Sequence, residues 1–278
     1  MLFADVALAA RVEAAECRLS LEIASAVRDR VTDVVAMPVG GGAAVFTGLG
    51  APVNKVIGVG FAGPLDPSDL DVIEQAFFAR RSSVRFEVAT LADPAVGRLL
   101  TEHGYRLAGF ENVLGLQLAA AVESPPAADL TVERLEQADT QVWFDVVVEG
   151  FSHPDGSAVA PDEEFEREAL RQIFDDFARS PAYRAYLCRW QGTPAGGAGM
   201  RLDTGIAQLA GAATLPAFRR RGVQAALLRF RLKNAEEAGC DLAVVTTAPG
   251  SKSQHNAQRQ GFELLYPRAI LTKAFDEP

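Results

Sequence analysis

The sequence predicts an α/β protein of the α+β type, made of two similar halves that each combine a mixed, mostly antiparallel sheet with flanking helices. Apolar runs rich in β-branched residues alternate with amphipathic helical segments along the chain. A segment that follows residue 88 recurs after residue 245 at a constant offset. With 278 residues, of which 49% are hydrophobic and 23% charged, the chain is long enough for two domains of roughly 100–200 residues each.

In the first half, hydrophobic periodicity predicts a long opening helix, after which strands and helices alternate. The predicted elements are a helix at about 6–30, a strand at 55–61, a helix at 69–80, a strand through 88–90, a short helix, and a closing strand through 113–114. A stretch of Pro, Ala and Ser between Glu123 and Asp129 ends this half. It predicts two domains, at residues 1–122 and 129–278.

The second half has the predicted order β-α-α-β-β-β-α-β-α-β. Its elements are a strand at 130–135, helices at about 139–151 and 161–179, strands at 183–190 and 195–202 with a turn at 192–194, a strand at 206–215, a helix from residue 223, a strand at 242–247, a short helix at 251–260 and a closing strand through 270–271.

The two halves share a repeated segment. Gly104-Tyr105-Arg106-Leu107 aligns with Gly261-Phe262-Glu263-Leu264, and the same offset of 157 residues aligns the strands before and after these segments without a gap. Self-similarity at a fixed offset is typical of an internal duplication. The sequence therefore predicts that the first half is a copy of the second.

An arginine-flanked glycine stands between a predicted strand and a predicted helix. After the strand at 206–215 come Arg219, Arg220, Arg221 and Gly222, and the helix begins at Val223. At a helix N-terminus the first backbone N–H groups lack intrahelical partners and the helix dipole is positive. A glycine there lets a phosphate approach the backbone, so the segment predicts a pyrophosphate-binding loop.

The order strand, Arg-x-x-Gly-x-Gln-Ala, helix resembles the coenzyme A loop of the GNAT superfamily of acyl-CoA-dependent N-acyltransferases, whose pattern is Gln/Arg-x-x-Gly-x-Gly/Ala. Arg219 and Gly222 match this pattern, whereas Gln224 stands where the family has Gly or Ala. The short helix before Gly261 resembles the family's second cofactor motif. The resemblance covers residues 129–275. It implies acetyl-CoA as the cofactor, bound by Ala213, Thr214, Leu215, Arg219, Arg220, Arg221, Gly222, Val223, Gln224, Ala225, Ser253 and Asn256.

Acyl transfer to an amine needs a hydrogen-bond donor for the developing oxyanion, a proton donor for the leaving thiolate and a base for the amine. The resemblance implies that backbone amides near Ala213 and Thr214 serve the oxyanion. The family's usual acid is a tyrosine, but the matching position is Ala257. Ser253 and Tyr266 are therefore the candidate proton donors, although a serine near a helix start is more often a cap.

The base is expected on the first helix of the second half, which lines the acceptor groove in the family. Glu149 and Asp145 are four residues apart and share a helix face with Val142 and Val146. A partly buried carboxylate on this face would have a raised pKa and could accept the ammonium proton, so Glu149 is the favoured candidate. Both carboxylates could also simply face solvent. The three histidines, His103, His153 and His255, are expected to be structural, with His255 exposed on its helix.

Composition narrows the classes of function. The formal net charge of -9 argues against binding of nucleic acid, which needs a basic face, although the arginine triplet keeps that alternative open. No apolar run reaches the roughly 20 residues that span a bilayer, and no signal peptide is recognised, so a cytoplasmic location is expected. Cys17, Cys188 and Cys240 are too few and too scattered for a disulfide framework or a zinc site.

These features together predict an N-acetyltransferase that moves an acetyl group from acetyl-CoA to a primary amine of a small molecule or peptide. A non-catalytic acyl-CoA sensor or scaffold is the alternative, suggested by the missing tyrosine. In the first half, the connection Gly63–Asp69 has prolines and acids in place of arginines, and Val96 and Leu99 align with Ser253 and Asn256. That half is therefore expected to bind no cofactor and to pack on the catalytic half.

Overall fold

The computed structural model describes residues 2–118, 129–135, 140–153 and 167–275, and these form two compact units. Unit 1 contains Phe3–Val113 and the segment from Leu264 onward, and unit 2 contains Leu114–Glu263 together with Leu2. The Pro/Ala/Ser stretch lies outside the described residues except for Asp129. The division at 1–122 and 129–278 therefore stays a prediction.

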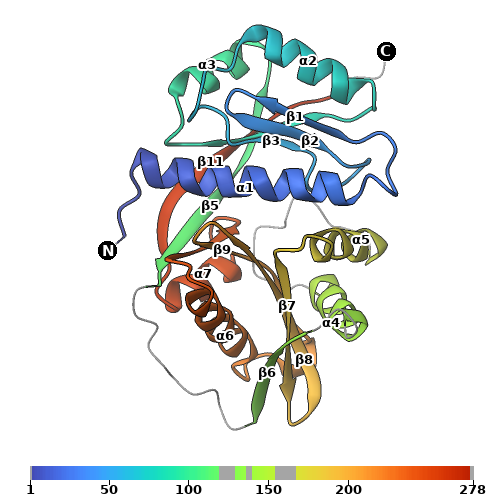
Figure 1. The fold of residues 1–278 in the computed structure, drawn as a ribbon, viewed down its shortest axis with the longest axis vertical. Coiled ribbons are helices and arrows are strands. Elements are labelled where there is room, and N and C mark those ends of the chain that lie inside the picture. The colour runs from blue at the N-terminus through green and yellow to red at the C-terminus, as the bar shows by residue number, and fades with distance from the viewer. Residues whose placement is uncertain (1, 119–128, 136–139, 154–166, 276–278) are drawn as a thin grey trace. The chain divides into compact units, whose positions relative to one another are not determined.

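Unit 1 is a mixed sheet with one long helix packed against β1, β2 and β3 (Figure 1). Its strands lie in the order β1-β2-β3-β4-β11-β5; β3 and β4 run parallel, whereas β1–β2, β2–β3 and β4–β11 are antiparallel. The elements are α1 (Val6–Ala26), β1 (Val35–Val39), β2 (Gly42–Phe46), β3 (Lys55–Ile57), α2 (Pro67–Phe78), β4 (Val84–Ala89), α3 (Pro94–Glu102), the first part of β5 (Arg106–Gln117), and β11 (Glu263–Lys273).

Three features of unit 1 differ from the sequence-based expectation. The hairpin of β1 and β2 was not predicted, because its run of small residues lacks a clear alternation. The strand that begins at Lys55 ends at Ile57 instead of residue 61, because Gly58 and Gly60 adopt positive φ values of 77° and 85°. The opening helix ends at Ala26 rather than residue 30.

Unit 2 has the elements predicted for the second half in the predicted order, except that the closing strand, β11, belongs to unit 1. They are β6 (Leu130–Arg134), α4 (Thr140–Ser152), α5 (Arg167–Ala178), β7 (Tyr183–Trp190), β8 (Thr193–Asp203), β9 (Ile206–Thr214), α6 (Val223–Glu237), β10 (Leu242–Thr247) and α7 (Lys252–Arg259). Its strands lie in the order β10-β9-β8-β7-β6, and the end of β5 adds beside β10. The turn between β7 and β8 is tighter than predicted, because Gln191 and Gly192 both adopt positive φ and Thr193 already pairs with Trp190.

Helices cover both faces of the unit 2 sheet, with α6 on one face of β8 and α4 on the other (Figure 1). Adjacent glycines of β8 demonstrate this, because side chains alternate between the faces of a strand. A Cβ atom on Gly196 would lie 2.5 Å from Val223 of α6, whereas one on Gly197 would lie 3.0 Å from Trp143 of α4. Both helices therefore pack directly on the strand backbone.

The three cysteines are all buried, as expected for small hydrophobic residues.

The pairing of strands supports the duplication. In unit 1, Val56 of β3 pairs with Phe86 of β4 in a parallel ladder, and in unit 2, Ala207 of β9 pairs with Ala243 of β10 in the same way. Phe86 and Ala243 are again 157 residues apart. The closing strands are exchanged, however: β11 pairs with β4 in unit 1, and the end of β5 lies beside β10 in unit 2.

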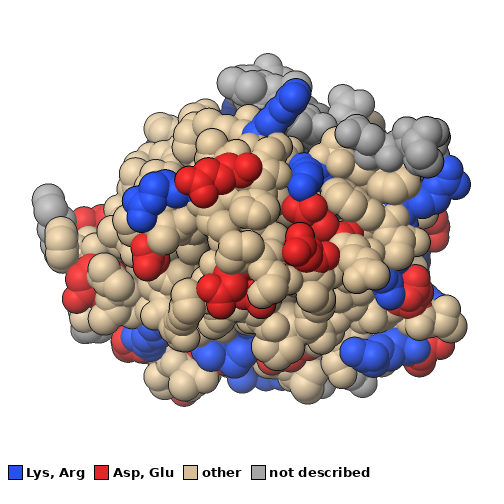
Figure 2. All heavy atoms as spheres, turned by 90° about the horizontal axis from the view of Figure 1, so that it is seen from above, with Lys and Arg blue, Asp and Glu red and all other residues tan. Residues whose placement is uncertain are grey.

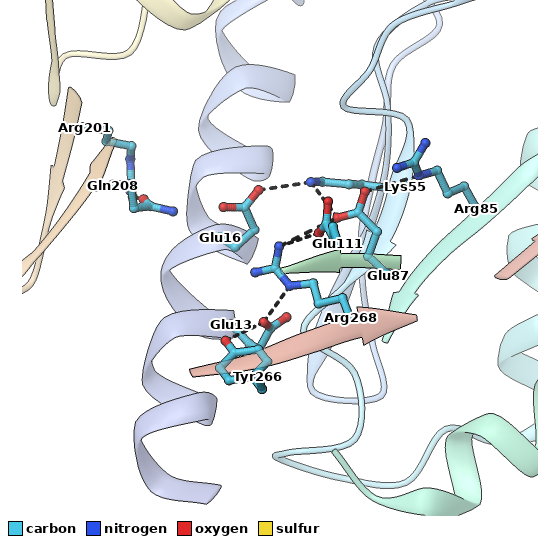
Figure 3. Close-up of polar contacts among 10 residues, drawn as sticks. All are labelled: Glu13, Glu16, Lys55, Arg85, Glu87, Glu111, Arg201, Gln208, Tyr266 and Arg268. Carbon is cyan, nitrogen blue, oxygen red and sulfur yellow. Dashed lines mark hydrogen bonds and ion pairs between the residues drawn. The ribbon is translucent and has the colours of Figure 1, made fainter. Parts of the chain in front are cut away.

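Unit 1 buries a group of charged side chains between α1 and its sheet (Figure 3). Arg268 is 1% exposed, and its guanidinium contacts Glu13 at 2.7 Å and Glu111 at 2.8 Å. Lys55 contacts Glu87 at 2.9 Å and Glu16 at 3.0 Å. We call these six residues the ion cluster; they are Glu13, Glu16, Lys55, Glu87, Glu111 and Arg268.

The charges of the ion cluster set its pKa values in opposite directions. Burial alone would raise the pKa of Glu87, but the nearby charges of Lys55, Arg268 and Arg85 outweigh burial and lower it. The pKa of Glu13 is raised, because the effect of burial exceeds the opposite effects of the Arg268 charge and the hydrogen bond from Tyr266. The cluster therefore contains a firmly ionised carboxylate on β4 and a carboxyl group on α1 that holds its proton more tightly.

Candidate functional site

The arginine-flanked glycine lies at the N-terminus of α6, as the sequence predicts. Gly222 caps the helix in the left-handed region, with φ of 82°. The first intrahelical bond runs from the Ala226 N–H to the Gly222 carbonyl at 2.9 Å, so the N–H groups of Val223, Gln224 and Ala225 precede the helical hydrogen-bond ladder. Among the described residues, a Cβ atom on Gly222 would meet only Leu130, at 3.7 Å, so these residues leave the turn open in front of the helix dipole.

The three arginines of the loop have different environments. Arg219 donates a hydrogen bond to the backbone carbonyl of His153 at the end of α4. The guanidinium of Arg221 lies over the rings of Trp190, at 4.9 Å, and Phe218, at 5.8 Å. Arg220 is exposed and adopts a positive φ of 62°. The triplet is therefore not a uniform charge run, because two of its members are tied to neighbouring elements.

The side chain of Gln224, which departs from the family pattern, has a partner. Its amide donates to the hydroxyl of Thr214 at 3.1 Å. Thr214 is the last residue of β9, and Gln224 lies in the first turn of α6. The amide therefore ties the end of the strand to the start of the helix, which positions the connecting loop.

Strand β9 separates from β10 before either strand ends. Their parallel pairing covers Ile206–Gln208 and Leu242–Val244, but β9 continues to Thr214 and β10 to Thr247. The separated part of β9 contains a bulge: opposite Gly197–Gly199 of β8, the strand β9 has one extra residue, and Gly211 adopts a φ of 58°. The Phe174 ring packs directly on Gly211, where a Cβ atom would lie 2.6 Å from Cε1 of that ring.

The short helix α7 presents the two other predicted cofactor contacts. Ser253 and Asn256 are both exposed and lie three residues apart, on one side of the helix. The N-cap is Ser251, whose hydroxyl accepts from the Gln254 N–H at 3.1 Å, so Ser253 is not the cap. Ala257 is 6% exposed and belongs to the core of unit 2. His255 is exposed, as expected.

A cavity of about 320 Å³ lies beside α4 in unit 2. It is lined by Val142, Asp145, Val146, Glu149, Arg167 and Leu215. The predicted helix face of α4 therefore forms one wall, and the residue that follows β9 forms another. Gly150 brings α4 close to β9, because a Cβ atom there would lie 2.7 Å from the Cβ of Ala213.

Both carboxylates of the cavity are paired with arginines. Glu149 contacts Arg167 at 2.6 Å and Asp145 contacts Arg171 at 3.3 Å. The hydrogen bond from Arg167 lowers the pKa of Glu149, and its half-exposed carboxylate loses little hydration. The expectation of a raised pKa for Glu149 is therefore wrong, because the helix α5 supplies an arginine at this point.

Tyr266 lies in unit 1, in β11, and is 2% exposed. Its hydroxyl donates a hydrogen bond to Glu13 at 2.8 Å (Figure 3). Burial raises the pKa of this phenol, and the charge of Glu13 raises it further. The hydroxyl is thus committed to the ion cluster, and we assign it no catalytic role.

Sequence reasoning set His153 aside, yet its ring lies beside Glu149. Nδ1 of His153 is 3.2 Å from Oε1 of Glu149, one helical turn away. The spacing Glu-x-x-x-His at the end of a helix could have indicated this pair. The contact from Arg219 could not be foreseen, because it joins residues that are 66 positions apart.

Surface charge and the character of the helices bear on the other classes of function. Basic and acidic side chains are interspersed on the face drawn in Figure 2. Among the residues that the structure describes, each helix is too short or too polar to cross a membrane.

Comparisons with known proteins agree with this geometry. Residues 147–262 match the family model "Acetyltransferase (GNAT) family". No curated protein matches the sequence at a significant level. The fold is similar to that of a GCN5-related N-acetyltransferase from Kribbella flavida, with a TM-score of 0.64 and 21% identity over 91% of this chain and 95% of that chain.

Two further solved structures share the fold. One is a tandem GNAT protein from the clavulanic acid biosynthesis pathway, with a TM-score of 0.59 and 13% identity over 93% of this chain and 88% of that chain. The other is a GCN5-related N-acetyltransferase from Sphaerobacter thermophilus, with a TM-score of 0.57 and 15% identity over 76% of this chain and 68% of that chain. Residues 147–262 thus match the GNAT acetyltransferase family, which uses acetyl-CoA, and the chain shares its fold with solved N-acetyltransferases that include a tandem GNAT protein.

Proposed function

We propose that unit 2 transfers the acetyl group of acetyl-CoA to a primary amine of a small molecule or peptide, which binds in the cavity beside α4. One observation carries the proposal. Leu215 lines the cavity, directly follows the separated strand β9 and precedes the loop at Arg219–Gly222. An acceptor in this cavity would therefore lie next to the strand and the loop that suit a thioester and a pyrophosphate.

The residues of the loop fit an anionic pyrophosphate. The N–H groups of Val223, Gln224 and Ala225 and the positive end of the α6 dipole face an open turn. Arg220 is exposed at the same turn and adds positive charge. We assign the pyrophosphate to these groups, and the tie between Gln224 and Thr214 keeps them in place.

The separated part of β9 fits the extended arm of the cofactor. Beyond Gln208, the edge of β9 that faces β10 is released from the parallel ladder, and an extended amide chain can pair with such an edge. The bulge at Gly211 redirects the following amides. Acetyl-CoA, when bound, supplies an activated thioester carbonyl, and we place the oxyanion donors among the amides of Ala212, Ala213 and Thr214.

The cavity favours an amine of limited size that carries positive charge. Asp145 and Glu149 both reach its wall, and the low pKa of Glu149 keeps that carboxylate ionised at neutral pH. Val142 and Val146 supply apolar contact. The volume of about 320 Å³ suits a small amine, and because the site opens to solvent it also suits the end of a peptide.

For the departing thiolate, Ser253 remains the candidate proton donor. It is exposed and does not serve as the cap of α7. Asn256, on the same side of the helix, is suited to contact the cofactor. The buried Ala257 offers no acidic group.

We further propose that unit 1 binds no acetyl-CoA. The start of α2 is closed by a capping box, in which the Asp66 side chain accepts from the backbone of Asp69 and the Asp69 side chain accepts from the backbone of Asp66. The segment that follows β3 is hydrogen-bonded to the start of α3, which follows β4, because the N–H of Asp93, the N-cap of α3, donates to the Gly60 carbonyl at 2.9 Å. In unit 2, a free helix N-terminus and two separated strands would admit the cofactor. In unit 1, the corresponding groups form hydrogen bonds within the protein.

The test is the release of free thiol from acetyl-CoA with a panel of primary amines that includes diamines, amino acid amides and short peptides. The expected result is turnover with a subset of small cationic amines, and its loss in the variant Gly222→Asp. Tight binding of acetyl-CoA without turnover on any amine would instead support the non-catalytic sensor or scaffold.

A further inference from the structure

The last turn of α4 places an imidazole beside the proposed acceptor cavity. Nδ1 of His153 lies 3.1 Å from the backbone oxygen of Glu149 and 3.2 Å from its Oε1. The ring is 56% exposed, so it can exchange protons with water. Glu149 and its partner Arg167 both line the cavity, and the ring therefore contacts one residue of the cavity wall without itself being part of the lining.

These contacts determine which nitrogen carries the proton in the neutral ring. Both oxygens near Nδ1 are acceptors only, and a neutral imidazole has one N–H and one lone pair. Nδ1 therefore carries the hydrogen, which leaves the lone pair on Nε2. A carboxylate that holds one nitrogen of an imidazole leaves the other free to accept a proton, as in other acid–histidine pairs.

Glu149 itself is poorly suited to remove a proton from an ammonium group. Arg167 donates to its Oε2 at 2.6 Å and lowers the pKa of the carboxylate. A carboxylate stabilised in its charged form has little tendency to become protonated. Its second oxygen, Oε1, is the one that faces the imidazole. The arrangement suits an orienting group and not the base.

The cofactor loop also contacts this turn of α4. Arg219 donates to the backbone oxygen of His153, so the residue is fixed from both sides: Glu149 holds the ring and Arg219 holds the main chain. Among the residues that the structure describes, the charged groups near His153 are Glu149 on α4, Arg167 on α5 and Arg219 in the loop before α6. His153 thus connects the wall of the acceptor cavity with the loop assigned to the pyrophosphate.

We propose that Nε2 of His153 is the base that takes the proton from the acceptor ammonium, directly or through one water, and that Glu149 positions the ring. This proposal rests on the acetyl transfer proposed above. The proton passes to Nε2 and gives an imidazolium and a neutral amine. The amine then forms the new C–N bond as the C–S bond breaks. The second proton that the nitrogen loses as it becomes an amide passes to the leaving thiolate, through Ser253 or water, and the imidazolium releases its own proton to water.

A first experiment does not depend on turnover. Long-range ¹H–¹⁵N correlation spectra distinguish the two neutral forms of histidine, and the chain contains three histidines, so the variant His153→Gln assigns the signal. We expect the neutral His153 ring to carry its proton on Nδ1 in the full-length protein. A ring that is mainly protonated on Nε2 overturns the proposal, because the lone pair would then face Glu149.

A second experiment compares two acceptors of different basicity. An alkylamine needs a base at neutral pH, whereas a hydrazide of similar size is already neutral. We expect His153→Gln to lower kcat/KM for the alkylamine about 100-fold, to affect the hydrazide far less, and to abolish the acid limb of the pH profile. The KM for acetyl-CoA should not change. The exposed His255→Gln is the matched control and should behave as the wild type.

The outcomes separate this proposal from the proposed function. If the wild type turns over and His153→Gln has the same pH profile and the same rate with the alkylamine, the base assignment is wrong and the acetyl transfer stands. An equal loss with both acceptors indicates a structural role and also overturns the assignment. A wild type that releases no thiol with any amine refutes the acetyl transfer, and the base assignment with it.

Discussion

The variants Gly222→Asp and Gly222→Asn together test the pyrophosphate site, because the two side chains have nearly the same shape and differ by one negative charge. Asp and Asn both adopt the left-handed region more readily than other non-glycine residues. The conformational cost of the φ of 82° is therefore similar in the two variants and cancels when they are compared. Of the residues that the structure describes, only Leu130, at 3.7 Å, lies close to a Cβ atom at this position, so either side chain has room. We expect both variants to fold, and their difference in affinity for coenzyme A to measure the electrostatic repulsion.

The size of that repulsion follows from Coulomb's law. A carboxylate on Cβ of residue 222 would lie about 5 Å from a phosphate held at the start of α6, where each pair of unit charges costs about 1–3 kcal/mol at an effective dielectric constant of about 20–80. The dissociation constant of the Asp variant should therefore exceed that of the Asn variant about 5- to 150-fold, measured by calorimetry at low salt. The ratio should shrink as salt is added. Equal affinities at low salt would refute the assignment of the loop.

Three further predictions concern the two units. Calorimetric titration of the whole chain with acetyl-CoA should saturate at one equivalent, whereas saturation at two would show that unit 1 also binds. In unit 2, Gly199→Ala places a Cβ atom 1.6 Å from the Tyr183 hydroxyl and should destabilise the unit by about 1–3 kcal/mol, measured by urea unfolding followed by tryptophan fluorescence. The second substitution Tyr183→Phe removes the hydroxyl and should restore part of the lost stability. If it restores none, the predicted clash is wrong. In unit 1, the pKa of Glu87 lies below its ordinary 4.5, so its ionised form stabilises the fold above that pH and this stability is lost on acidification. Glu87→Gln should lower the free energy of unfolding by about 3–5 kcal/mol at pH 7 and by less below pH 4, measured by hydrogen exchange of β4. A loss of stability that does not depend on pH would contradict the ion pair.

The elements that local patterns define could be predicted from the sequence. The run of β-branched residues at 242–247 is β10 with the same bounds, and the strand and helix around Gly222 are in place. Such patterns report on which face of an element is buried, and this is a local property. The separation of β9 from β10 and the bulge at Gly211 have no counterpart in the local pattern, because a bulge at a glycine leaves no periodic signal.

The features that depend on distant contacts could not be predicted. Lys55 and Glu87 lie in strands, where a charged residue normally indicates a solvent-facing position, yet both are buried because they neutralise each other. The membership of Tyr266 in unit 1 depends on the pairing of β11 with β4, between residues more than 170 positions apart. The pKa of Glu149 likewise depends on Arg167 of another helix.

The exchange of closing strands has a consequence for biosynthesis. By its contacts, unit 2 is inserted into unit 1 between residues 113 and 264. During translation, every residue of unit 2 up to Glu263 is therefore synthesised before β11 can join unit 1. Until then, Glu13 and Glu111 lack the guanidinium of Arg268, with which they pair in the folded unit. Domains usually complete in order from the N-terminus during translation. In this protein the order is reversed: the N-terminal unit begins first and closes last.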